Sequence, residues 1–375
     1  MTMKTKLWLA PLGLALTVVA LGACSDKLVE EPRSFVTTDT FYKTQADLQS
    51  GVLATYAQLR VAFGFGAANY YGLDDASDQA IPDPGETSAN IVAISRLDYS
   101  PSSTNLTEGL WAPGYLLVYR ANLVIDQAAN VSMDAATKAQ WVAEAKFLRA
   151  YTYLQLSKLY SAGGTDAAAD VPLLLTTADH ANPAAARAKT AEVHAQVVKD
   201  LTEAEAALPA AWTGTGAGRA TKGAAQMALA DLYLWRSSFL KSNEWQKASD
   251  WARKVIDNPA YGLNDNYFAT FLPANRGNRE MIFRVVAAAD SRGSTAAVNT
   301  YFPRVLGFSP QGGGFGISQP TDWLVSSYAA GDYRGNAGPQ SDTVAFRTSG
   351  CSVTASVGCR TFRPHLWKYR PSSIC

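Results

Sequence analysis

Four acidic side chains in one stretch of this sequence have the chemistry that glycoside hydrolysis requires. Asp74, Asp78, Glu86 and Glu108 all lie within residues 63–110. A glycosidase uses two carboxyl groups about 5–10 Å apart, one as the proton donor and one as base or nucleophile. Spacing along the chain does not establish such a pair, and neither Gly-x-Ser-x-Gly nor His-Glu-x-x-His occurs. We therefore expect no enzyme activity.

A glycine-rich stretch at residues 214–222 invites comparison with a phosphate-binding loop. It lacks the Gly-Lys-Ser/Thr order of such loops, and no strand is expected before it, so we predict a plain linker between helices. His180, His194 and His365 are far apart and have no metal-ligand spacing. We predict surface or capping positions for these histidines, no metal site and no cofactor.

The composition is that of a globular protein whose surface is close to neutral. The chain has 375 residues, with 33 Lys and Arg against 32 Asp and Glu, a net charge of +1. This balance argues against nucleic-acid binding, which needs a basic surface. Apolar residues make up 47% and charged residues 17%, which excludes a disordered chain.

Helical periodicity dominates most of the chain and predicts the elements that must position any site. We expect helices over residues 38–60, with Thr38 and Asp39 as cap candidates, and over 111–129, 134–160, 190–208, 221–239 and 244–256. Residues 63–110 lack this period and are rich in Gly, Pro, Asn, Ser and Asp, which predicts a long loop region with at most short strands. Residues 281–286 read as a strand, and residues 321–328 as a short helix.

The helices at 221–239 and 244–256 resemble a tetratricopeptide pair. Leu229-Ala230-x-x-Tyr233 matches the first half of that repeat, whereas Ala248-x-x-x-Ala252 and Pro259 match the second half less well. Small residues at 230 and 248 would let the two helices approach closely. The pair therefore predicts a helical-repeat scaffold.

The first residues form an export signal. Lys4 and Lys6 precede an apolar run over residues 7–21, too short to span a bilayer comfortably. The run ends in Leu21-Gly22-Ala23-Cys24, which resembles the lipobox of bacterial lipoproteins and predicts lipid attachment at Cys24. The alternative is ordinary signal cleavage that leaves Cys24 as a free thiol. In an exported protein Cys351 and Cys359 are a plausible disulfide, and a reduced pair is equally compatible with the spacing.

Several ordered motifs make the mature chain similar to the SusD/RagB family, the lipid-anchored nutrient-binding partners of TonB-dependent outer-membrane transporters. The motifs are Gly51-Val52-x-x-x-Tyr56-x-x-Leu59-Arg60, Ser77-Asp78-Gln79, Tyr119-Arg120-Ala121-Asn122, Ala143-Glu144-Ala145-Lys146-Phe147-Leu148-Arg149, Val171-Pro172-Leu173, Ala220-Thr221-Lys222-Gly223, and Pro320-Thr321-x-x-Leu324. Gln79 replaces the Glu that the family usually has in the second motif. After Lys368-Tyr369 family members usually continue into further helices, so the resemblance implies a shortened member.

The resemblance implies a mostly α, SusD-like fold, with tetratricopeptide-like helical pairs as a scaffold and an irregular, loop-rich side facing the ligand. In this division residues 1–23 are a signal peptide and residues 24–375 one SusD-like domain. Within that domain we expect a tether at 24–36, a helical-repeat scaffold at 38–260 interrupted by the loop insertion 63–110, and a loop and short-strand part at 261–375.

The resemblance also implies the function and the partners. We expect an outer-membrane lipoprotein, surface-exposed, that binds an oligosaccharide or other nutrient and delivers it to a SusC-like TonB-dependent transporter. The alternative is a lipid-anchored helical-repeat scaffold that holds another protein and binds no small ligand. No nucleic acid is expected as a partner.

The ligand residues do not carry over by motif, so they are chosen by chemistry. Aromatic rings stack on the apolar face of a sugar, while polar side chains bond its hydroxyl rim. The loops offer six candidates: Tyr70, Tyr71, Asp74, Asp75, Asn105 and Phe315. For the tyrosines the alternative is plain loop packing, and for the aspartates it is turn capping. Trp111 and Arg149 are assigned to structure, with Arg149 expected to need an internal acidic or carbonyl partner.

Overall fold

The computed structural model describes residues 41–62, 75–82, 87, 89–98, 110–216, 218–271, 275, 277–285, 318–329 and 331–332. The chain divides into two units, Met1–Lys43 and Thr44–Cys375. Residues 41–43 are the described part of the first unit. All the elements discussed below belong to the second.

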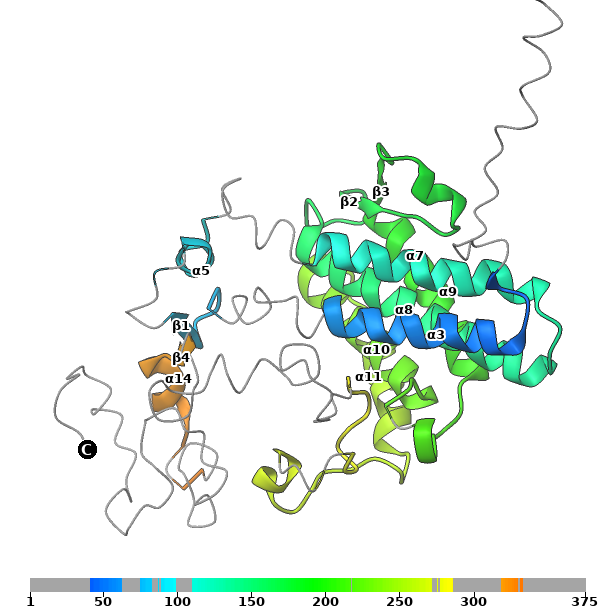
Figure 1. Cartoon of the computed structure of the whole chain (residues 1–375). Coiled ribbons are helices and arrows are strands. Elements are labelled where there is room, and N and C mark those ends of the chain that lie inside the picture. The colour runs from blue at the N-terminus through cyan, green and yellow to red at the C-terminus, as the bar shows by residue number, and fades with distance from the viewer. Residues whose placement is uncertain are drawn as a thin grey trace, which may run out of the picture. The chain divides into compact units, whose positions relative to one another are not determined.

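Six long helices form a stack in which each helix packs on the next one along the chain (Figure 1). They are α3 (Gln45–Arg60), α7 (Trp111–Gln127), α8 (Ala135–Tyr160), α9 (Thr190–Ala207), α10 (Lys222–Trp235) and α11 (Trp245–Ile256). Five of these helices match the predicted ranges to within a few residues. The mostly helical fold predicted from the sequence is confirmed.

Side-chain caps set where three of these helices begin. Asp134 accepts a hydrogen bond from the Thr137 amide at 2.8 Å, and Thr221 caps α10 through the Ala224 amide at 3.2 Å. The predicted caps Thr38 and Asp39 lie outside the described residues. Helix α3 itself begins later than predicted, at Gln45, where Thr44 and Asp47 form a capping box that supplies partners for both backbone amides.

The core is centred on α8, which packs against α3, α7 and α9. Phe147, Tyr153 and Leu154 of this helix are fully buried. They meet buried leucines of the neighbouring helices, among them Leu117 of α7 and Leu201 of α9. A helix that is apolar on more than one face must be covered on several sides, as the sequence predicted for this segment.

The packing of α10 on α11 follows the predicted use of small residues. Ala230 and Ala248 are both buried, 5% and 8% exposed. Between the two helices α10 widens into a π-helical turn, η5 (Arg236–Leu240), which ends at Lys241 with φ 58°. Because left-handed geometry breaks the helical path, the chain turns here and starts α11.

The remaining described elements are short. Two antiparallel ribbons pair β1 (Ala80–Pro82) with β4 (Ser318–Pro320), and β2 (Ala169–Pro172) with β3 (Arg187–Lys189). The short helices are α5 (Ala89–Ser95), α14 (Asp322–Ser327), η2 (Ala128–Asn130), η3 (Ala178–Ala181), η4 (Gly214–Gly216) and η6 (Tyr267–Phe271). Within the described ranges, no helix has the length and hydropathy needed to cross a membrane.

Two predictions of local structure are wrong. Residues 281–285, expected in a strand, are irregular. Their apolar character is explained by Phe283, which packs edge-on against Phe147 at 5.0 Å between ring centroids and contacts Tyr151 at 5.9 Å. The stretch expected to hold at most short strands contains a helix, α5, in addition to β1.

Candidate functional site

The β1–β4 ribbon joins two loop segments that are far apart in the sequence. The strands are antiparallel, with Ala80 opposite Pro320. Beyond the ribbon the Thr321 amide donates to the Gln79 carbonyl at 2.9 Å, and the Thr321 hydroxyl donates to the Asp78 carbonyl at 2.7 Å. The ribbon therefore fixes the start of α14 beside the turn that precedes β1.

Trp323 presents an aromatic ring to solvent at this junction. It is the second residue of α14 and is 56% exposed. The helix is held by Thr321, whose hydroxyl oxygen accepts from the Leu324 amide at 3.2 Å. Asp78 and Asp322, on the two segments that the ribbon joins, are also exposed. An aromatic ring with hydrogen-bond acceptors nearby is a combination that suits a sugar.

The structure describes one of the six ligand residues expected from the sequence. Asp75 lies in the turn before β1, and its side chain is buried, with 2% exposed. Tyr70, Tyr71, Asp74, Asn105 and Phe315 lie outside the described residues, as do Cys24, Cys351 and Cys359, and their roles stay predictions.

The ribbon's register sets where α14 begins. In an antiparallel pair the two strands begin at opposite ends, so Pro320, the last residue of β4, lies opposite Ala80, the first residue of β1. Helix α14 and Trp323 therefore follow from the end of the ribbon where β1 begins.

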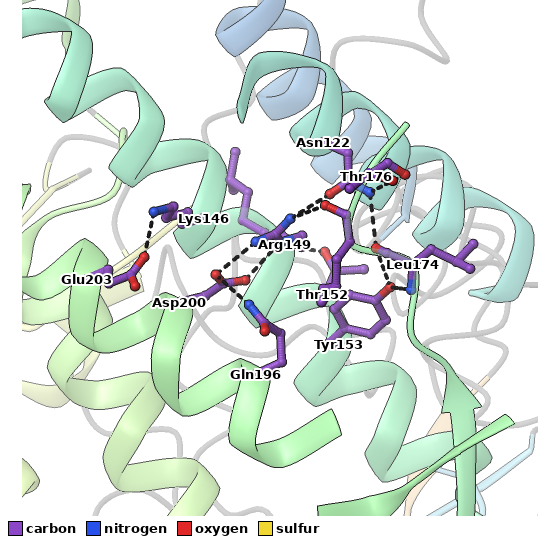
Figure 2. Close-up of polar contacts among 12 residues, drawn as sticks. Asn122, Lys146, Arg149, Thr152, Tyr153, Leu174, Thr176, Gln196, Asp200 and Glu203 are labelled. Atoms are coloured by element: carbon purple, nitrogen blue, oxygen red, sulfur yellow. Dashed lines mark hydrogen bonds and ion pairs between the residues drawn. The ribbon is translucent and has the colours of Figure 1, made fainter. Parts of the chain in front are cut away.

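A buried polar network ties α7, α8 and α9 together. Figure 2 shows Arg149 of α8 between Asp200 of α9 and Asn122 of α7. Its guanidinium makes two parallel bonds to Asp200, Nε to Oδ2 at 2.8 Å and Nη2 to Oδ1 at 2.9 Å. Nη1 donates to Asn122 Oδ1 at 2.8 Å and to the Leu175 carbonyl at 2.9 Å. The expectation that Arg149 needs an internal acidic or carbonyl partner is confirmed, with partners of both kinds.

The same residues hold the loop that follows β2. The Asn122 amide nitrogen donates to the Leu174 carbonyl at 3.0 Å, and the Tyr153 hydroxyl donates to the same carbonyl at 2.9 Å (Figure 2). The Leu174 amide in turn donates to the Tyr153 oxygen at 2.7 Å. Because Arg149, Asn122 and Tyr153 are all bonded internally, this network serves the fold and offers no free group to a ligand.

A second buried network joins α3 and α8 to the linker before α10. The fully buried Glu144 accepts two bonds from Arg219, at 2.7 and 2.6 Å, and one from the Tyr56 hydroxyl at 2.8 Å. The Tyr56 oxygen also accepts from the Ala220 amide at 2.8 Å, and Arg219 lies 4.3 Å from the centre of the Trp212 ring. Burial raises the pKa of Glu144, and Arg219 opposes that shift.

Three buried residues have the types of a serine-hydrolase triad but not its connections. The Ser157 hydroxyl donates to Asp170 Oδ2 at 2.6 Å and lies 3.0 Å from His194 Nε2. His194 Nδ1 lies 3.0 Å from a guanidinium nitrogen of Arg236. Arginine can only donate, so Nδ1 is the acceptor and Nε2 carries the proton.

This tautomer makes the trio structural. A protonated Nε2 donates to the Ser157 oxygen and cannot take its proton, and in a hydrolase the carboxylate contacts the histidine instead. Ser157 and Asp170 are fully buried and His194 is 2% exposed, so no substrate reaches them. The predicted surface or capping position of His194 is wrong, because polar groups on α8, β2 and η5 enclose it.

The burial of His194 predicts a pH dependence of stability. Burial first, and then the charge of Arg236, lower the pKa of His194 to about 4. The unfolded chain takes up a proton near pH 6.5, whereas the folded chain does so only near pH 4, so stability is full above pH 6.5 and falls as the pH drops. We expect this histidine to lower the free energy of unfolding by about 2 kcal/mol between pH 7 and pH 5, measured by urea unfolding.

The variant His194→Gln isolates this effect, since other buried groups also titrate. Burial raises the pKa of Asp170, and a raised carboxyl pKa changes stability with pH in the opposite sense to the histidine. The free energy of unfolding of the wild type should exceed that of His194→Gln by about 2 kcal/mol less at pH 5 than at pH 7. A difference that is the same at both pH values would contradict a neutral, enclosed imidazole.

Comparisons of sequence and of structure with known proteins both find SusD-like proteins. The model of a family described as "Starch-binding associating with outer membrane" (SusD-like) matches residues 67–234. SusD-like protein P2 of Formosa agariphila is 28% identical over 94% of this chain and 69% of its own length. SusD-like protein P25 of the same organism is 26% identical over 76% of this chain and 54% of its own length.

Solved structures of SusD-like proteins share the fold. A laminarin-binding SusD-like protein superposes with a TM-score of 0.66 at 23% identity, covering 76% of this chain and 64% of its own. The chain is therefore similar to SusD-like proteins, in sequence over residues 67–234 and in fold. Surface glycan-binding protein A of Bacteroides thetaiotaomicron, solved with laminarihexaose, gives a TM-score of 0.65 at 19% identity over 79% and 63% of the two chains. The chain spans about half the length of P25.

The motifs that carry the sequence resemblance meet in this SusD-like fold. Asn122 and Arg149, which end two of the motifs, are hydrogen-bonded to each other. Tyr56 contacts Glu144, in the same motif as Arg149, and the Ala220 amide, and so adds two further motifs to this set. The motif Ser77-Asp78-Gln79 and the motif that begins Pro320-Thr321 are joined by the ribbon. The family motifs therefore mark contacts that hold the fold and position its loops.

Trp323 was not among the ligand-binding candidates chosen from the sequence. It falls at an unassigned position of the motif Pro320-Thr321-x-x-Leu324, so the motif did not point to its side chain as a ligand-binding residue. The available signal was a large aromatic residue near the start of the short helix predicted over residues 321–328. Trp111 was assigned correctly, since it opens α7 and packs on Tyr115 and Tyr160 at about 5 Å between centroids.

Proposed function

We propose that this SusD-like protein binds an oligosaccharide at the outer membrane and delivers it to a SusC-like TonB-dependent transporter. The single observation that carries the binding part is the exposed Trp323, fixed by the β1–β4 ribbon between two loop segments. The relatives named for laminarin and solved with laminarihexaose support a glycan as the ligand class.

The proposed mechanism is binding without bond making or breaking. The indole of Trp323 offers a flat apolar face to the C–H side of a sugar ring, and the exposed carboxylates of Asp78 and Asp322 accept hydrogen bonds from hydroxyls. Within the helical stack, Arg149 and Glu144 are bonded internally, so the proposal gives these two charged groups no part in ligand binding.

We expect the exposed tryptophan to contribute strongly to glycan binding. Replacing Trp323 by Ala should weaken binding of any recognised oligosaccharide at least tenfold, the loss typical of a central aromatic contact. The measurement is isothermal titration against a panel of hexasaccharides. The control is Trp245→Ala, which removes a tryptophan of similar exposure, 48%, from the start of α11. Equal affinity of wild type and Trp323→Ala would refute the assignment.

The anchor and the transporter are tested separately from the ligand. Replacing Cys24 by Ser should move the protein from the membrane fraction to the soluble fraction if the cysteine carries lipid. A mild-detergent pull-down of the tagged wild type from its native membrane should recover a TonB-dependent transporter in equal amount. Recovery of the protein alone would argue against the delivery part and leave glycan binding standing.

A further inference from the structure

The loop insertion of this chain carries an unusual charge. Residues 63–110 contain seven acidic side chains and one basic one, Arg96, a formal net charge of −6, whereas the whole chain carries +1. The described part of the second segment, residues 318–329 and 331–332, holds Asp322 and Asp332 and no Lys or Arg, and Arg334 follows it in the sequence. The loop insertion is therefore acidic within a chain that is nearly neutral, and Asp322 adds a carboxylate on the segment paired with it.

Two of these acidic residues are linked through the backbone to the residue that carries the exposed indole. Asp78 and Asp322 are both exposed, and Thr321 links them, bonded to the Asp78 carbonyl and adjacent to Asp322 in the chain. Consecutive Cα atoms are about 3.8 Å apart, so the backbones of Asp78, Asp322 and Trp323 lie within roughly 10 Å of one another. That backbone separation is comparable to the Debye length at physiological salt, about 8 Å, so salt does not fully screen these two charges from an anionic group bound at Trp323.

We propose that this surface selects uncharged oligosaccharides and rejects sulfated and uronate glycans. The inference rests on the proposed glycan binding and adds the class of glycan. Carboxylates accept hydrogen bonds from sugar hydroxyls, which every uncharged sugar supplies. A sulfate or uronate group has no proton to donate and carries a charge of the same sign as Asp78 and Asp322. Arg96 is the one basic residue that the described parts of the two segments contain.

Structural roles such as burial and helix capping explain only some of these acidic residues. Asp75 is buried, and Asp322 lies in the first turn of α14, where a negative charge suits the helix end. The contact that fixes Asp78, however, uses its backbone carbonyl and leaves its carboxylate exposed. Capping therefore does not account for the surplus of charge beside Trp323.

The test compares matched neutral and charged ligands on the full chain, purified in mild detergent. The probes are laminarihexaose and its sulfated derivative, together with neutral malto-, cello- and xylo-hexaose and oligogalacturonate, titrated at 20 and 300 mM NaCl. We expect at least one neutral oligosaccharide to bind, and charged ones to bind at least tenfold more weakly at 20 mM NaCl. The gap should shrink at 300 mM NaCl because salt screens the repulsion.

Charge-neutral variants assign the effect to the proposed residues. The double variant Asp78→Asn, Asp322→Asn should narrow the neutral-to-charged gap at least threefold, while the control Asp250→Asn, on α11, should leave it unchanged. If charged glycans bind as tightly as neutral ones or more tightly, the selection is wrong and glycan binding itself stands. If a folded protein binds no probe of either class, the proposed glycan function falls as well. A gap that the double variant leaves intact would also overturn the assignment.

Discussion

Replacing Arg149 by Met is expected to lower the free energy of unfolding by about 3–5 kcal/mol, the usual cost of removing one partner of a buried ion pair. Asp200 is then left with its charge buried, 1% exposed, and Asn122 loses the partner of its carbonyl oxygen. Methionine fills part of the space, so the loss reports the uncompensated carboxylate more than a cavity. The measurement is urea unfolding followed by circular dichroism.

The chain offers a matched control on the same two helices. Lys146 lies one turn before Arg149 on α8 and pairs with Glu203 of α9, but these side chains are 24% and 41% exposed. Replacing Lys146 by Met should cost less than about 1 kcal/mol, because exposed pairs contribute little. Equal losses in the two variants would contradict the view that burial makes the Arg149 pair critical.

Replacing Arg219 by Leu is expected to cost about 3–4 kcal/mol at pH 8, again because a buried carboxylate loses its cation. Glu144 would keep only the Tyr56 hydroxyl, and its pKa, already raised by burial, would rise further. A raised folded pKa gives stability that is present at low pH and lost as the pH rises through it. The loss should therefore be smaller at pH 5 than at pH 8.

A second substitution checks the cause of that pH dependence. Adding Glu144→Gln to Arg219→Leu removes the titrating group, so the double variant should lose the extra dependence between pH 5 and pH 8. Its stability at pH 8 should exceed that of Arg219→Leu alone, since no buried charge remains unpaired. A pH dependence that persists in the double variant would place its origin elsewhere.

The helices could be predicted from the sequence because their signals are local. The caps Asp134 and Thr221 lie within three residues of the amides they bond, and apolar spacing marked α8 as a helix covered on several sides. Arg149 lies in one of the motifs that carry the resemblance, and its position within an apolar helix indicated that it needs an internal partner. The strand prediction for residues 281–285 was wrong because it depends on a non-local contact. The apolar Phe283 packs on α8 and has no strand beside it.

The candidate site was less predictable because its contacts are not local. The sequence around Asp78 does not indicate its contact with Thr321, which lies 243 residues away in the sequence. The buried His194 contacts Ser157 and Arg236, which come from two other elements, and Ser157 in turn donates to Asp170. Composition identified residues 63–110 as the segment with binding chemistry, but only the pairing of β1 with β4 associated that segment with Trp323.

The length of chain closed by the β1–β4 ribbon has a consequence for folding and for ligand response. Tying together two points 243 residues apart in an unfolded chain costs about 5 kcal/mol of loop-closure entropy, more than a three-residue ribbon returns. The ribbon therefore forms after the helices have shortened the path, and it opens before they unfold. Its amides should exchange hydrogen with solvent ahead of those in α8, and a glycan that spans both segments should slow that exchange by acting as a reversible cross-link.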